Sequence, residues 1–342
     1  MCWLNFSLSG DSPSFPSPLY FCPRAFPRPI CMSKYDLNVP WPILGYGKAS
    51  SAQIAALKAT ISTALALDYT HIAVNFTVPE GTRLPVHDPA SINPVPMGEL
   101  AKHFEKSFPN ARLFSRLTLM VADPAQIQGL AKIQNHFDIL AVQPTTEKAL
   151  QLAVSNLDID IVSLNLAQRL PFYLKHKTVC SGVDRGVHFE LCYASLIGGP
   201  AGYTSNGSEM VLSTTALAAR KNFFSNALQL IRASRLRGLV VSSGATHPLQ
   251  LRNSSDILTV LKTIGLESGR TKHCVTSSPE RALVSGRLRI KSYKQTVIAG
   301  NDAGRDVLWS NDSEETKKLD SSGYKKRTSE AAGGLLKKHR KA

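Results

Sequence analysis

The sequence lacks the motifs that mark most metal-dependent and nucleotide-binding enzymes. None of its six cysteines belongs to a C-x-x-C pair or another zinc-ligand spacing, and there is no H-x-H or H-E-x-x-H pair. A G-x-S-x-G elbow is missing, and neither a P-loop nor a G-x-G-x-x-G follows a predicted strand. These absences argue against a zinc finger, a zinc hydrolase, a serine hydrolase and a dinucleotide-binding enzyme.

Long hydrophobic runs and clustered cysteines are also missing. No apolar stretch approaches the ~18 residues that a membrane-spanning helix needs, and the N-terminus lacks the basic start and unbroken apolar core of a signal peptide. The cysteines are scattered along the chain, which disfavours a disulfide framework and indicates a reducing compartment. We therefore expect no membrane association.

Acidic residues are scarce relative to basic ones. The 342 residues include 40 Lys and Arg against 25 Asp and Glu, so the net charge is +15, and the pI is about 9.6. A strong positive excess suggests an anionic partner, and nucleic acid is the commonest one for a basic protein. A basic surface without such a partner is the alternative, because net charge alone does not identify a ligand.

Short apolar runs alternate with amphipathic runs from about residue 34 to 290, which is typical of a parallel sheet covered by helices. Runs such as DILAV and GLVVSS contain no alternating polar residues, as expected for strands that are buried on both faces. About eight strand–helix units in ~255 residues fit an α/β fold, a (β/α)8 TIM-like barrel, and an open doubly wound sheet is the alternative. The predicted strands span residues 34–39, 71–76, 112–121, 138–142, 158–166, 178–184, 238–244 and 272–277. The predicted helices span residues 51–67, 97–107, 123–137, 146–157, 214–235, 255–265 and 279–288.

Three segments differ in composition from this α/β region. Residues 1–31 precede Met32, which opens a domain-like MSKYDLNVPWP, so we expect them to be a disordered extension or a mis-assigned translation start. A Gly/Ser-rich loop spans 198–210, and residues 291–342 are too polar to offset the entropy of ordering. We therefore predict a single barrel domain over 32–290, followed by a disordered basic tail. The end of that tail would contact phosphate, act in nuclear targeting or simply be solvated, and its candidate phosphate contacts are Lys337, Lys338, Arg340 and Lys341.

The carboxyl ends of the strands, where a barrel enzyme carries its chemistry, contain mostly amides. The polar residues predicted there are Asp36, Asn38, Asn75, Gln143, Asn165, Asp184, Arg185, Ser242, Ser243 and His247. A catalytic metal site needs several converging histidine and carboxylate ligands, and amides bind zinc or manganese weakly. Asp36, Asp184 and His247 would be the ligands of the rival hypothesis, a metal-dependent phosphoesterase. We expect no metal, no cofactor and no catalytic residue.

The motif GVDRGVHFEL, residues 182–191, concentrates charge after an apolar run. Asp184 and Arg185 are placed to join charge pairs at a strand end, and Glu190, between Phe189 and Leu191, is predicted to be a partly buried acid that needs a partner such as arginine. In this interpretation Asp184 and Glu190 are structural. The alternative is a contact surface in which Arg185 binds a partner.

The neighbouring motif QRLPFYLKHK interleaves basic residues with aromatic ones. Its candidates are Arg169, Phe172, Tyr173, Lys175 and Lys177. This mixture suits phosphate contact combined with base stacking. It equally suits an ordinary protein interface, where arginine and aromatic residues are enriched.

Several motifs in a fixed order carry a resemblance to a known family. They are RLT at 116–118, PTTEK at 144–148, LDIDIV at 157–162, LPFY at 170–173, DRGVHFEL at 184–191 and VVSSGATHPLQLR at 240–252. Together they resemble the TIM-barrel protein subunit of eukaryotic and archaeal ribonuclease P, whose eukaryotic members are shared with ribonuclease MRP. The resemblance covers roughly 34–289, and it leaves out the first 31 residues, the 198–210 loop and the tail.

The resemblance implies a barrel related to the polymerase-histidinol-phosphatase metal enzymes, but with a structural role. In ribonuclease P the RNA cleaves the 5′ leader from precursor tRNA, and the MRP complex cuts precursor ribosomal RNA. The implied partners are ribonuclease P RNA, MRP RNA, a small ferredoxin-like protein subunit and other subunits, in the nucleus including the nucleolus. Metal-binding relatives carry H-x-H at the end of the first strand, where this chain has Asp36-Leu37-Asn38. We therefore expect the isolated chain not to be an enzyme, with Arg252 added to the contact candidates.

Overall fold

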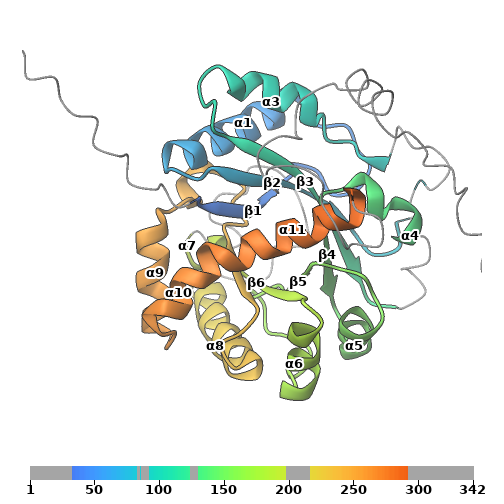
Figure 1. Cartoon of the computed structure of the whole chain (residues 1–342), viewed down its shortest axis with the longest axis vertical. Helices are drawn as coiled ribbons and strands as arrows, with labels where there is room; N and C mark the ends of the chain where they lie inside the picture. The colour runs from blue at the N-terminus through green and yellow to red at the C-terminus, as the bar shows by residue number, and fades with distance from the viewer. Residues whose placement is uncertain (1–32, 83–84, 86–91, 124–129, 198–215, 292–342) are drawn as a thin grey trace, which may run out of the picture. The chain divides into compact units, whose positions relative to one another are not determined.

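The computed structural model describes residues 33–82, 85, 92–123, 130–197 and 216–291 (Figure 1). The segments predicted to be disordered, including the basic cluster at 337–341, lie outside this part of the chain, apart from residue 291. The strands of the described residues form one sheet of seven parallel strands. They are β1 (Tyr35–Pro40), β2 (His71–Val78), β3 (Arg112–Val121), β4 (Ile139–Pro144), β5 (Ile161–Ser163), β6 (His188–Cys192) and β7 (Leu239–Ser242).

The strands follow one another around the sheet in chain order, from β1 to β7, as in a barrel. An open doubly wound sheet reverses its order in the middle, and this sheet does not. The two end strands come together, because the Gly244 amide, just after β7, donates a hydrogen bond of 2.9 Å to the Asn38 carbonyl in β1. The predicted barrel is therefore confirmed as a nearly closed one, with seven strands in the described residues.

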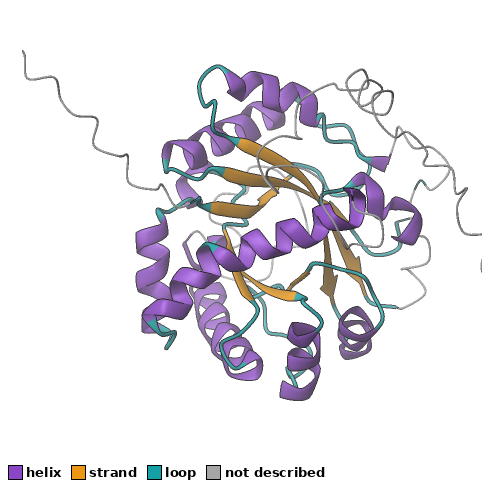
Figure 2. Cartoon of the chain, in the orientation of Figure 1, coloured by secondary structure: helices purple, strands orange, loops and turns teal. Residues whose placement is uncertain are grey.

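Helices surround the strands, and one helix crosses the end of the barrel (Figures 1 and 2). Ser50 begins the first helix with a capping box, in which its side chain and that of Gln53 each accept the other's backbone amide. No helix in the described ranges is long and apolar enough to cross a bilayer. The helices are α1 (Ser51–Ala66), α3 (Met97–Glu105), α4 (Leu130–Ile133), α5 (Glu147–Ser155), α6 (His176–Asp184), α7 (Ala194–Ile197), α8 (Ala216–Ser234), α9 (Ser254–Thr263), α10 (Ser268–Val275) and α11 (Ser277–Lys291), with 3-10 turns η2 (Gln134–His136) and η4 (Pro248–Gln250).

Two predicted strands are wrong. Residues 178–184 belong to α6, which buries Val179 and Gly182 at a helical spacing of three, and residues 272–275 belong to α10. The strand of the sixth unit is instead β6, whose first four residues are all buried. Short apolar runs rich in β-branched residues fit either structure, and only the packing decides between them.

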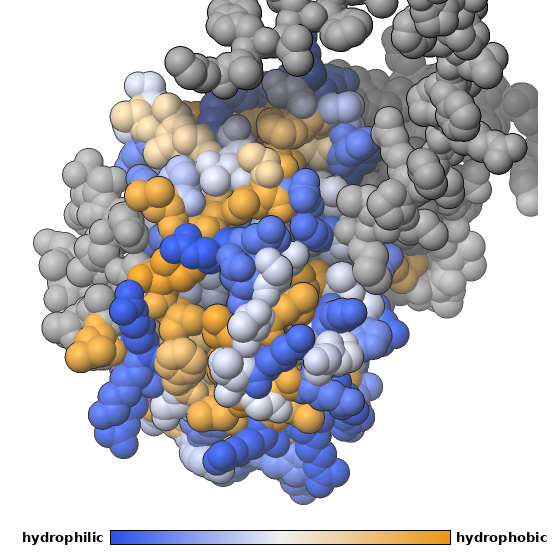
Figure 3. Space-filling view, turned by 90° about the vertical axis from the view of Figure 1, so that its left-hand side faces the viewer, coloured by the Kyte–Doolittle hydropathy of each residue, from blue (hydrophilic) through white to orange (hydrophobic). Residues whose placement is uncertain are grey.

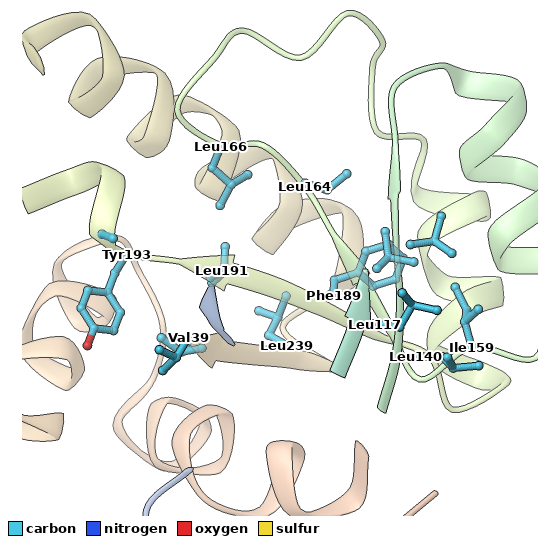
Figure 4. Close-up of a cluster of buried hydrophobic side chains, with 14 of the residues drawn as sticks. Val39, Leu117, Leu140, Ile159, Leu164, Leu166, Phe189, Leu191, Tyr193 and Leu239 are labelled. Atoms are coloured by element: carbon cyan, nitrogen blue, oxygen red, sulfur yellow. The ribbon is translucent and has the colours of Figure 1, made fainter. Parts of the chain in front are cut away.

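The core has two layers, one outside the strands and one inside. The outer layer packs strand side chains such as Leu117, Phe189 and Leu191 against the helices (Figure 4). Inside the barrel, Ala282 and Leu283 of α11 pack on inward-facing strand residues and close that end. The strand residues of this inner cluster are Tyr35, Leu37, Ala73, Phe114, Ile139, Ala141, Ile161 and Val240.

Helix α11 is fixed in this position by a buried ion pair. Arg289 donates to the Asp160 carboxylate at 2.8 Å, and the two side chains are 3% and 5% exposed. The same carboxylate oxygen accepts the Leu140 amide at 2.8 Å. Gly286 lies so close to the strand end that a Cβ there would come within 2.0 Å of the Asp138 carbonyl oxygen. Both features hold α11 directly against the backbone of the barrel.

Candidate functional site

A closed circuit of hydrogen bonds, here called the polar ring, fills the barrel interior beyond the inner apolar cluster. Its members are Asn38, Asn75, Arg116, Thr118 and Glu190. Arg116 donates from Nε to the Thr118 hydroxyl (3.2 Å), and that hydroxyl donates to Asn75 (2.7 Å). Asn75 donates to Asn38 (2.8 Å), and Asn38 donates to Glu190 (3.2 Å). The circuit joins β1, β2, β3 and β6 across the barrel.

The centre of the polar ring is an ion pair between Arg116 and Glu190. Both side chains are 0% exposed, and Arg116 donates to the two carboxylate oxygens at 2.5 and 2.7 Å. Arg116 also donates to the Leu37 carbonyl at 2.7 Å. The sequence predicts a partly buried Glu190 with a partner such as arginine. The structure buries Glu190 completely, and its partner is Arg116, 74 positions away in the chain.

A β-bulge places Asn38 in this ring. The pairing of β1 with β2 shifts between Asp36 and Val39, so that one extra residue of β1 faces β2. Leu37 can then join the inner apolar cluster, while Asn38, the next residue, also reaches the interior and bonds Glu190. Without the bulge, neighbouring residues of a strand would point to opposite faces.

The charges of Arg116 and Glu190 interact strongly, because both side chains are shielded from water. Burial by itself would raise the pKa of Glu190, but the Arg116 guanidinium outweighs burial and holds that pKa below its ordinary value. Burial would lower the pKa of Arg116, and Glu190 outweighs burial there and raises it. Both groups are therefore ionised, and their charges cancel inside the barrel.

Asp36, the first candidate metal ligand, lies beside the ring at the seam between β1 and β7. One oxygen of its carboxylate accepts the Ser243 amide at 2.9 Å and the Asn38 amide at 3.3 Å. The other oxygen is buried and has no hydrogen-bond partner in the described residues. Burial raises the pKa of Asp36 to about 6, against its ordinary value of 3.8, although Ser243 and Asn38 oppose the rise.

The side chains present do not fit a metal ion of the kind used by phosphoesterases. Within the described ranges, no three His, Cys, Asp or Glu side chains converge on a point that could hold a metal. Glu190 is engaged with Arg116, and a fixed positive charge repels a cation. Asp184 ends α6, before β6, whereas His247 begins η4, after β7. The three predicted ligands therefore do not form one site, and the placement of Asp184 at a strand end is wrong.

The motif at 169–177 lies at the end of the barrel that contains the carboxyl ends of the strands, between β5 and α6. Arg169, Lys175 and Lys177 are exposed, and Tyr173 is 71% exposed, whereas Phe172 packs against the outer core. These five residues are here called the β5–α6 surface. Two asparagines of α8 hold the preceding loop, because Asn226 donates to the carbonyls of Leu166 and Gln168, and Asn222 donates to that of Ala167. The basic and aromatic groups are thus presented on a fixed backbone.

The other contact candidates are separated from this surface or engaged with backbone. Arg185 lies at the opposite end of α6. It donates to the carbonyl of Val154, in the last turn of α5, and to that of Leu157, just after the helix. Arg252 follows η4, at the same end of the barrel as the β5–α6 surface, and donates to the carbonyls of Leu249 and Leu251 at 2.8 and 2.7 Å. Asp184 is exposed and pairs with Arg237 at 3.4 Å.

Sequence reasoning missed Arg116 and Thr118 as members of the ring. The available signal was an arginine within the otherwise buried strand sequence RLFSRLTLMV. A charged residue at a buried strand position requires a partner of opposite charge. Asn38 and Asn75 were identified as strand-end polar residues, and the structure brings them together through their side chains.

Comparison with known proteins places this chain in a family. Residues 33–291 match the family model described as RNase P subunit p30. The chain is 39% identical over 272 residues to the ribonuclease P/MRP protein subunit RPP1 of Saccharomyces cerevisiae, covering 79% of this chain and 86% of that protein. It is 28% identical over 254 residues to the ribonuclease P protein subunit p30 of Mus musculus, covering 71% and 85%. A chain in a cryo-EM structure of archaeal ribonuclease P with mature tRNA aligns with a TM-score of 0.48 and 18% identity, covering 78% and 96%. The chain therefore belongs to the RNase P subunit p30 family.

Proposed function

We propose that the chain is a non-catalytic protein subunit of the ribonuclease P and MRP ribonucleoproteins. It would support the 5′ maturation of precursor tRNA and the processing of precursor ribosomal RNA, with RNA as the catalyst. The observation that carries the non-catalytic part is the Arg116–Glu190 pair, which occupies the barrel interior with two fully buried, mutually neutralised charges. A group whose hydrogen bonds are satisfied inside the fold is not available to activate a water or hold a metal.

The β5–α6 surface is proposed as a contact with RNA or with a partner protein. Its three cations and Tyr173 are exposed within the nine residues 169–177, and Lys175 also pairs with Glu147 at 2.5 Å. An exposed ring beside cations supports stacking on an unpaired base together with phosphate contact. Arg252, at the same end of the barrel, would extend this contact, and Phe172 would support it from below. Arg185 is better explained as a cap of α5.

The partners proposed are ribonuclease P RNA, MRP RNA, a small ferredoxin-like subunit and other proteins of the complexes. The proposed location is the nucleus, including the nucleolus. Similarity to the yeast ribonuclease P/MRP subunit over most of both chains supports this assembly. The excess of basic residues supports direct contact with a polyanion.

Purification of a tagged, full-length copy from its own cells, followed by sequencing of the co-purified RNA, tests the proposal. We expect ribonuclease P and MRP RNAs to be enriched at least tenfold over an untagged control. A matched Tyr173→Ala/Lys177→Ala variant should recover less RNA or less partner protein while it keeps its melting temperature, because both side chains are exposed. If a folded wild-type chain enriches neither RNA, the proposed function is refuted.

A further inference from the structure

We infer that the chain has a second RNA-contact surface, a cleft at the end of the barrel where β6 and β7 begin, which binds backbone phosphates. The cleft has a volume of about 860 Å³ and lies between the end of α6, the start of β7, α10 and α11. The residues that matter for its chemistry are Arg237, Arg270, His273, Ser277, Ser278 and Arg281. These six residues are here called the basic cleft.

The positive charge of the cleft comes from three separate elements. Arg237 lies between α8 and β7, Arg270 lies in α10 and Arg281 lies in α11, and all three are exposed. Acidic groups only partly offset this charge. Glu280 also lines the cleft, and Asp184 pairs with Arg237 at 3.4 Å, with both partners largely exposed. Arg270 and Arg281 are left as the main source of positive potential.

The buried His188 provides further evidence that Arg281 contributes positive charge to the cleft. His188, the first residue of β6, lines the floor of the cleft and is 8% exposed. Burial lowers the pKa of His188, and the nearby Arg281 guanidinium lowers it further. This histidine is therefore neutral at physiological pH, and Arg281 lies close enough to affect it. Residues 186–188, which lead into β6, thus line the cleft together with Arg281.

The lining chemistry favours phosphate and sugar over bases. Arginine forks match phosphate oxygens, and the hydroxyls of Ser277 and Ser278 are further hydrogen-bond donors. Among the described residues that line the cleft there is no Phe, Tyr or Trp, so they offer none of the large rings on which bases stack. The face that carries α9 and α10 interleaves hydrophilic with hydrophobic residues (Figure 3). Contact with an RNA backbone, independent of its sequence, fits these properties.

The basic cleft is separate from the β5–α6 surface. Helix α6 has nine residues and begins next to Lys175 and ends at Asp184, so the two regions are about 14 Å apart along its axis. The choice of RNA as the polyanion rests on the proposed function, whereas the position of the cleft does not. The experiment below therefore separates a failure of the cleft proposal from a failure of the proposed function.

The test measures binding of the purified, full-length chain to transcribed ribonuclease P RNA over a series of KCl concentrations. The cleft variant is Arg270→Glu/Arg281→Glu. Its matched control, Lys102→Glu/Lys106→Glu, makes the same change of charge at exposed positions in and just after α3, on a different side of the barrel (Figure 1). We expect Kd to rise at least tenfold for the cleft variant near physiological salt, and less than threefold for the control. Loss of two phosphate contacts should reduce the slope of log Kd against log[KCl] by about 1.4–1.8.

Equal weakening by the cleft variant and the control would overturn the inference, because only overall charge would then matter. An unchanged RNA affinity, with loss of a protein subunit from the complex purified from cells, would also overturn it and assign the cleft to an acidic protein. In either case wild-type binding to the RNA leaves the proposed function intact. If the wild-type chain neither binds nor co-purifies with the RNA, the proposed function itself fails.

Discussion

Replacing Glu190 with Gln should strongly destabilise the barrel. The substitution keeps the size of the side chain but leaves the Arg116 guanidinium, which is 0% exposed, without a counter-charge. Two charge-assisted hydrogen bonds, at 2.5 and 2.7 Å, lose their ionised acceptor. Breaking a buried pair by removing one charge typically costs about 3–5 kcal/mol. The free energy of unfolding should fall by this amount, from a total of roughly 5–15 kcal/mol for a domain.

Urea denaturation followed by circular dichroism measures this loss, and the melting temperature should fall by about 10 °C. The matched control is Glu147→Gln, which removes an equally short but exposed pair with Lys175. Exposed pairs contribute only about 0–1 kcal/mol, so this variant should be nearly neutral. A double variant, Arg116→Met/Glu190→Leu, should lose less stability than Glu190→Gln, because it leaves no unpaired charge. Two results would contradict this reasoning about a buried ion pair. One is a loss of less than about 1 kcal/mol for Glu190→Gln, and the other is a larger loss for the double variant than for Glu190→Gln.

Three further predictions concern single positions. Because the fold raises the pKa of Asp36 from 3.8 to about 6, its ionised form is disfavoured in the folded state, and stability should fall by about 3 kcal/mol in all as pH rises from below 3.8 to above 6. Urea denaturation of the wild type at pH 4.5 and 7.5 should detect about 2 kcal/mol of this loss, and Asp36→Asn should remove it. Equal pH dependence of the two proteins would contradict the prediction. Gly286→Ala should cost about 2–3 kcal/mol, because its Cβ would clash with the Asp138 carbonyl, whereas Gly269→Ala, with open space around it, should be neutral or stabilising in the same melting assay. Arg185→Gln should lower stability by about 1 kcal/mol through loss of the α5 cap without changing RNA affinity, and a weaker Kd with unchanged stability would instead identify a contact.

The fold was largely predictable because its strands are buried on both faces. HIAVNF and DILAV become β2 and β4, with buried residues nearly throughout, and no polar alternation conflicts with that placement. The sixth unit was misassigned because residues 178–184 combine β-branched residues with a short length, and only the burial of every third or fourth residue reveals a helix. For the same reason the strand at 188–192, which contains His188 and Glu190, was missed.

The interior site was only half predictable. The sequence indicates that a buried Glu190 needs an arginine, but it cannot identify Arg116, since β3 and β6 meet across the barrel only after the whole sheet has formed. The bulge that turns Asn38 inward depends on a pairing shift of one residue between β1 and β2.

The role of an exposed contact candidate is harder to predict for a different reason. Whether a surface arginine contacts a partner or caps a neighbouring helix, as Arg185 does, depends on the geometry of a segment about 30 positions away.

The ring also explains how a barrel with seven described strands closes. The parallel ladder runs from β1 to β7, and among the described residues no strand pairing joins the two ends. Instead, Asp36 accepts the Ser243 amide, and the Asn38 carbonyl accepts the Gly244 amide and the Ser243 hydroxyl. Asn38 in turn bonds Glu190 of β6, on the far side of β7. Asp36 and Asn38 of β1 therefore serve to close the sheet. These groups are engaged in closure, whereas the basic and aromatic contact candidates Arg169, Tyr173, Lys175 and Lys177 are exposed outside the barrel interior.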